Sequence, residues 1–107
     1  MSLYDRLLGN DGFVKIPVHG FQAVLCEFAR GQATGQQAQT AIAAMSSGVP
    51  LDAGEVTEAT TLLATITAAT GTMNKINRAL EINDVLMLGE LGGGYTTVQA
   101  IKTRLGV

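Results

Sequence analysis

The sequence is short of charge, and the shortage is concentrated in its middle. Only 15% of the 107 residues are charged, against about 25% in typical globular proteins. Residues 31–74 carry three charged side chains, all acidic: Asp52, Glu55 and Glu58. So little charge leaves apolar groups exposed, which is typical of a surface that contacts other protein. The formal net charge of −2 argues against a nucleic-acid partner, because such binding needs Lys and Arg to neutralise phosphates.

Cysteine, a basic leader and long apolar runs are also scarce or missing. The single cysteine, Cys26, excludes an internal disulfide and fits synthesis in a reducing compartment. No basic segment followed by an apolar one opens the sequence, so we expect no secretory signal. No apolar run approaches the roughly 20 residues of a membrane-spanning helix. We therefore expect a protein made in the cytoplasm that does not bind a membrane.

Glycines and turn residues divide the chain into segments with helical patterning. Apolar residues recur in these segments at steps of three and four, which predicts helices with one inward face. Thr34 with Gln37, and Asp52 with Glu55, form capping boxes that begin two helices, and Thr96 is expected to cap the last. The predicted helices cover residues 3–8, 17–30, 35–45, 53–70, 72–91 and 97–105. The predicted fold class is all-α, a compact bundle of five to six short helices with an N-terminal arm.

Two of the predicted helices, residues 53–70 and 72–91, have distinctive compositions. Residues 53–70 contain many β-branched side chains, which lower helix propensity, so a strand is the alternative there. Steps of three and four nevertheless favour a helix. The residues expected to face inward on it are Val56, Ala59, Leu63 and Ile66. Residues 82–91 are apolar on all sides, which is typical of a helix at the centre of a core or an interface.

Residues 1–16 are expected to form an N-terminal arm, distinct from a bundle domain of residues 17–107. A short amphipathic helix is followed by a tether that ends in extended backbone, because Ile16 precedes Pro17. The arm could fold back on its own core or lie on a neighbouring subunit, and the low charge of the chain supports the neighbour. The arm residues expected to contact a partner are Leu3, Tyr4, Leu7, Phe13, Val14 and Ile16.

The titratable residues form no catalytic or metal-binding pattern. His19, the single histidine, has no nucleophile or orienting carboxylate beside it, and Cys26 adds no metal-ligand spacing. Glu81 and Asp84 could share a helix face, but a lone carboxylate pair is more typical of solvated charge or of partners for Arg78. We therefore predict no enzyme activity, no cofactor and no metal.

Two motif-like stretches also have simpler interpretations. Gly92–Gly94 precede a helix, as phosphate-binding loops do, but no Lys-Ser/Thr pair follows them and no convincing strand precedes them. A hinge or tight turn is the better interpretation. Residues 21–45 could be drawn as a helix-turn-helix, but its second helix has no Lys or Arg to contact phosphates. Both interpretations agree with the absence of a nucleic-acid partner.

Three stretches resemble small helical proteins encoded among the virion structural genes of tailed bacteriophages: MSLYDRLLG, IPVHGFQAVLCEFARGQATGQQ and INDVLMLGELGGGYTTVQAIKTRLGV. They cover both ends of the chain, and the Ala/Thr-rich middle matches less clearly. Such proteins commonly have no assigned function, so the resemblance implies a setting, the virion, and carries no catalytic residues. It does not distinguish a place on the capsid shell from a place with the tail.

Composition and resemblance together suggest a phage accessory protein, most simply a capsid decoration or cement protein that stabilises the shell by protein–protein contacts. We expect it in the virion after synthesis in the host bacterial cytoplasm, as a homo-oligomer or in many copies. Its partners would be the major capsid protein or a tail protein, contacted by the Thr and Gln faces of residues 31–74. The alternatives are a tail-associated adaptor or chaperone, supported by the apolar arm and Gly92–Gly94, and a small regulatory binding protein.

Overall fold

Six helices and no strand form in the residues that the computed structural model describes, which are 2–10, 12–90 and 97–107. The helices are α1 (Leu3–Leu8), α2 (Val18–Ala29), α3 (Gly35–Ser46), α4 (Ala53–Thr67), α5 (Thr72–Glu90) and α6 (Val98–Leu105). The predicted all-α fold class is therefore confirmed. None of these helices combines the length and the apolar character that crossing a membrane requires.

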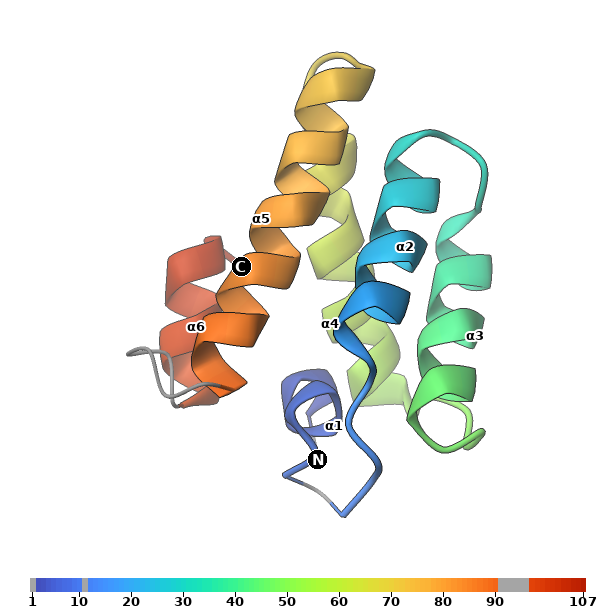
Figure 1. The fold of residues 1–107 in the computed structure, drawn as a ribbon, viewed down its shortest axis with the longest axis vertical. Helices are drawn as coiled ribbons and strands as arrows, with labels where there is room; N and C mark the ends of the chain where they lie inside the picture. Colours follow the sequence, from blue (N-terminus) through green and yellow to red (C-terminus); the bar gives the residue numbers. More distant parts are fainter. Residues whose placement is uncertain (1, 11, 91–96) are drawn as a thin grey trace.

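The helix α5 lies at the centre of the bundle. It packs most extensively against α2, and it also contacts α4, α6 and α1. In Figure 1 the helices α3, α2, α5 and α6 follow one another across the molecule, and α4 lies behind α2 and α5. Ala79, Ile82 and Val85 of α5 are buried in the core, whereas Leu88 is 45% exposed. The apolar second half of α5 thus turns only part of its circumference to the core.

Capping side chains begin the helices largely where the sequence predicts them. Ser2, Thr34 and Asp52 each accept a hydrogen bond from the backbone N–H three residues later, and the side chain of that later residue bonds back to the cap. The cap of α6 is Thr97, whose hydroxyl accepts from the Ala100 N–H at 3.1 Å. The predicted cap, Thr96, lies outside the described residues. Two adjacent threonines offer the same capping group, so the sequence alone did not separate them.

The helix α4 differs from its prediction at its end and along its inward face. It is helical, so the strand alternative is wrong, and it ends at Thr67 where the prediction ran to residue 70. Val56 was expected to face inward but is 37% exposed. The residues that α4 buries are Glu55, Ala59, Leu62, Leu63 and Ile66. Ala59, Leu63 and Ile66 are thus buried as predicted. Glu55 takes the buried place expected of Val56, because a cationic partner for its carboxylate lies opposite it.

The N-terminal segment belongs to the core of the bundle. The helix α1 packs against α4 and α5, and Figure 1 shows it beneath them. Leu3, Leu7 and Ile16 belong to the same hydrophobic cluster as residues of the other helices, such as Ile82 and Ile101. This cluster crosses the predicted domain boundary at residue 16, so the arm and the bundle share one core.

Candidate functional site

The structure corrects the predicted contact surface on the N-terminal arm. Four of its six residues are buried inside the chain's own core: Leu3, Tyr4, Leu7 and Ile16. Phe13 is half-buried, with its ring centroid 4.4 Å from the Arg6 guanidinium carbon. Val14, at 72% exposure, is the one member of the set that is open to solvent. The arm folds back because its own core buries these apolar side chains, at about 25 cal/mol per Å² removed from water.

The titratable residues singled out from the sequence are spread over the surface. His19 is exposed on α2, and Cys26 is half-buried against the core. Glu81 Oε2 lies 3.1 Å from Arg78 Nη1 in an ion pair, and Glu81 Oε1 accepts from Arg104 Nη1 at 3.3 Å, which joins α5 to α6. Glu81 is therefore a partner of Arg78, which is one of the two interpretations of these carboxylates, and Asp84 is exposed. In residues 2–10, 12–90 and 97–107, no three His, Cys, Asp or Glu side chains are grouped to hold a metal ion, and Gly92–Gly94 lie outside these ranges.

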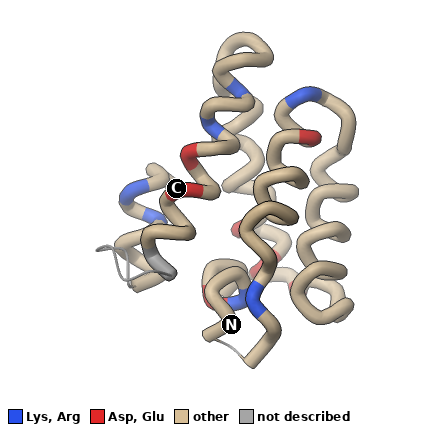
Figure 2. The backbone as a smooth tube through the Cα atoms, in the orientation of Figure 1, with Lys and Arg blue, Asp and Glu red and all other residues tan. Residues whose placement is uncertain are grey.

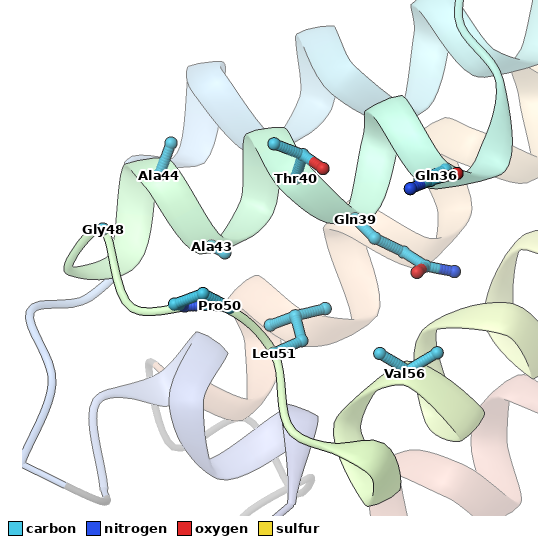
Figure 3. A pocket seen from close by; sticks show the side chains of 9 residues that line it. All are labelled: Gln36, Gln39, Thr40, Ala43, Ala44, Gly48, Pro50, Leu51 and Val56. Carbon is cyan, nitrogen blue, oxygen red and sulfur yellow. The ribbon is translucent and has the colours of Figure 1, made fainter.

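The outward face of α3 and α4 lacks charge over two adjoining grooves. The helix α3 carries no charged residue, and in Figure 2 its tube is uniformly tan. Groove A, with a volume of about 320 Å³, lies between α3, the loop after it and the start of α4 (Figure 3). Groove B, with a volume of about 520 Å³, lies farther along α3 and α4 and reaches α2. Both grooves are open depressions on the surface of the protein.

The described residues that line the two grooves are all uncharged. Groove A is lined by Gln36, Gln39, Thr40, Ala43, Ala44, Gly48, Pro50, Leu51 and Val56. Groove B is lined by Phe28, Gly35, Gln39, Thr60, Leu63, Ala64, Thr67 and Ala68. Gln39 belongs to both, and its side-chain amide donates to the Thr60 hydroxyl at 3.2 Å across the helix pair. Figure 3 shows Gln39 and Val56 pointing from opposite helices into the space between them. The two grooves and the exposed residues between them are called the α3–α4 face below.

Three exposed threonines of α4 donate their hydroxyl hydrogens within their own helix. The hydroxyls of Thr57, Thr61 and Thr67 donate to the backbone carbonyls of Ala53, Thr57 and Leu63, at 3.0, 3.0 and 3.3 Å. All three side chains are exposed. A buried hydroxyl donor without a partner is unfavourable by about 1–3 kcal/mol. Because these donors already have partners in their own helix, another protein can cover them without that penalty.

The arginine of a buried ion pair also contacts the loop that forms one wall of groove A. Arg6 Nε donates to Glu55 Oε2 at 2.6 Å, and Arg6 Nη2 donates to Glu55 Oε1 at 3.0 Å. The same guanidinium donates to the carbonyls of Val49 and Pro50, at 2.9 and 3.5 Å. Glu55 Oε1 also accepts from the Asp52 N–H at 2.9 Å, which completes the cap of α4. One guanidinium therefore joins α1 to the loop and to the first turn of α4.

A second polar cluster joins α1 to α4 and α6. Tyr4 is buried, and that burial raises the pKa of its hydroxyl to about 12, with the negative charge of Glu58 adding to the rise. Lys102 Nζ lies 3.4 Å from Glu58 Oε2 and 5.7 Å from the centroid of the Tyr4 ring. The backbone N–H of Leu3 donates to Glu58 Oε1 at 3.4 Å. These contacts reinforce the docked position of α1.

Comparison with known proteins gives no family to which the chain can be assigned. No family model, no curated protein and no solved structure matches it. The interpretation of the α3–α4 face therefore rests on its own chemistry. An open, uncharged surface of amides, hydroxyls and small apolar groups suits contact with another protein surface better than it suits an ionised small molecule, which needs charged or convergent polar partners.

Proposed function

We propose that this protein is an accessory structural protein of a tailed-phage particle, and specifically a capsid decoration or cement protein. The observation that carries the proposal is the uncharged α3–α4 face with its two adjoining grooves. Covering such a face removes no ion from water, so the large desolvation penalty of charged surfaces does not arise. The resemblance of both ends of the sequence to virion-cluster proteins supplies the setting.

The size of the face favours a protein that acts in many copies. The helices α3 and α4 have 12 and 15 residues, so they are about 18 and 22 Å long. Two such helices side by side, each about 10 Å wide, offer a flat area of roughly 400 Å². A stable one-to-one complex usually buries about 800 Å² on each partner. A single contact through this face would therefore be weak. Copies of the protein that are linked to one another and bind many equivalent sites on a shell would be held more tightly by avidity.

The alternative, a tail-associated adaptor or chaperone, has less support. Its sequence support was the apolar arm and the hinge at Gly92–Gly94. The arm is buried on its own core, and the hinge lies outside the described residues. We therefore treat the tail as one of the outcomes of the test below.

The test adds purified protein to phage particles that lack it and measures binding and copy number by quantitative mass spectrometry of capsid and tail fractions. Thr40→Lys places a charge in groove A and Ala64→Lys places one in groove B. Gln99→Lys, on the exposed surface of α6, is the matched control. We expect each groove variant to lose about tenfold or more in capsid binding, and the control to bind as the unchanged protein does.

Three results would contradict the proposal. Absence of the added protein from both the capsid and the tail fractions would remove the virion role altogether. Recovery with tails and not with capsids would favour the adaptor. Equal binding by the groove variants and the control would show that a different surface makes the contact.

A further inference from the structure

Groove A has a wall whose position depends on a residue far away in the sequence. Gly48, Pro50 and Leu51 line the groove, and Arg6 of α1 donates to the carbonyls of Val49 and Pro50 in the same loop. We propose that α1 is a clamp that keeps groove A in shape, with Arg6 as the positioning residue. As a statement about docking, this inference rests on the proposed function, whereas its structural part can be tested without any partner.

The guanidinium group is matched to this task. It gives two donors to the Glu55 carboxylate and two more to carbonyls of the loop. The half-buried Phe13 ring lies against it, 4.4 Å from the guanidinium carbon. A lysine ammonium has three donors on one atom and cannot hold a carboxylate and two separate carbonyls in one plane. Arg6→Lys therefore keeps the charge and loses the bonds to the loop.

The order of α1 and the order of the loop are coupled. A helix of six residues is unstable by itself, because nucleation is unfavourable and few hydrogen bonds follow it. The helix α1 is formed because Leu3, Tyr4 and Leu7 pack on α4 and α5 and because Arg6 pairs with Glu55. When α1 leaves, Glu55 loses its cation and the loop loses two donors in the same event. Helix, loop and the first turn of α4 thus form one cooperative unit.

This coupling has a consequence for binding. A partner that fills groove A stabilises the loop position that Arg6 selects, so it also stabilises docked α1. By reciprocity, docked α1 raises the affinity of groove A for that partner by the same factor. Groove B, which borders none of the loop residues 47–51, should be independent of α1.

The test is amide hydrogen exchange on the full chain, comparing Arg6→Lys with Arg30→Lys, an exposed arginine at the end of α2. In Arg6→Lys we expect the Gly48 and Val49 amides to exchange faster than in the unchanged protein. This acceleration should exceed any acceleration at the core amide of Ile82 by about tenfold. Arg30→Lys should leave all three unchanged. Equal acceleration at loop and core would mean that Arg6 only stabilises the whole fold, and an unchanged loop would mean that Arg6 does not position it. Either result overturns the proposal.

A double variant covers the case in which Arg6→Lys does not fold. Arg6→Met with Glu55→Met replaces the buried ions by apolar groups, an exchange that buried ion pairs often tolerate. Its loop should exchange faster while the core stays protected, and a fully protected loop would again overturn the clamp. Capsid binding is measured separately for the same variants. A loosened loop together with unchanged binding by Thr40→Lys would uphold the clamp and reject the proposed function.

Discussion

Arg6 Nε lies 2.6 Å from Glu55 Oε2, although the two residues are 49 positions apart in the sequence. The side chain of Arg6 is 3% exposed and that of Glu55 is 2% exposed. Each ion alone would be strongly unfavourable at this depth, because the desolvation penalty is several kcal/mol per charge. Arg6→Ala leaves the Glu55 carboxylate buried without its cation. We expect the free energy of unfolding, measured by urea denaturation, to fall by about 3–5 kcal/mol.

The double variant Arg6→Met/Glu55→Met tests the cause of that loss. It should be more stable than Arg6→Ala, and close to the unchanged protein, because no buried charge remains unpaired. If the double variant is as unstable as Arg6→Ala, the lost bonds to Val49 and Pro50 are the larger contribution and the unpaired charge is the smaller one.

Gly48 and Gly54 form a matched pair for testing backbone conformation. A methyl group added at Gly48 would meet no atom within 4 Å, and one added at Gly54 would meet only Asp52 Oδ1 at 3.5 Å. Gly48 has a φ of +78°, whereas Gly54 lies in the first turn of α4. Gly54→Ala should raise the free energy of unfolding by about 0.5 kcal/mol, and Gly48→Ala should lower it by about 1 kcal/mol. Thermal unfolding of both variants measures this, and changes of the same sign would contradict it.

The buried Tyr4 hydroxyl predicts a loss of stability at high pH. Its pKa is raised from 10.0 to about 12 in the folded chain, so folding favours the neutral form. The stabilisation is complete below pH 10 and is lost as the pH rises from 10 to 12. Tyr4→Phe, which cannot ionise, should show a smaller fall in the free energy of unfolding over this window. Ultraviolet titration of tyrosinate provides the check, and a Tyr4 that ionises near pH 10 in the folded chain would contradict the prediction.

Asn83 is a polar residue at a place in the core that suits an apolar one. It is 4% exposed, and it borders a narrow slot of about 20 Å³ that is otherwise lined by apolar residues such as Ile16 and Phe21. Asn83→Leu keeps the number and branching of the side-chain heavy atoms and removes a polar amide from a largely apolar setting, so we expect the free energy of unfolding to rise by about 1 kcal/mol. Destabilisation in urea would show that the amide has a favourable partner in the slot, such as a water molecule.

The fold was predictable where local chemistry decides it. Capping boxes at Thr34 and Asp52 act within four residues, so the sequence is enough to place the starts of α3 and α4. Ala59, Leu63 and Ile66 of α4 are buried as predicted, and only Val56 was wrongly expected to face inward, in place of Glu55. Glu55 lies four residues before the buried Ala59. The helical spacing therefore already indicated that Glu55 faces the core. What the sequence could not supply was the identity of the cation that makes a buried carboxylate tolerable.

The site was predictable only in part, for the same reason. The Thr and Gln faces of residues 31–74 were expected to meet a partner, which stays a prediction, and the α3–α4 face places Gln39 and Thr60 on one surface. The loop wall at Gly48 and Pro50 was not expected, because it depends on Arg6 more than 40 residues earlier. Contacts over that distance along the chain follow from packing, and no local pattern encodes them.

The Arg6–Glu55 pair also constrains how this chain can have diverged. A single change at either position leaves a buried charge without a partner, so a path through either single variant passes through a much less stable protein. Positions 6 and 55 should therefore be exchanged together among descendants of a common ancestor, either kept as arginine with an acid or replaced as a pair by apolar residues. That linked pair, with a glycine-bearing loop about seven residues before the acid, offers a fingerprint for finding distant kin whose overall sequences have drifted beyond recognition.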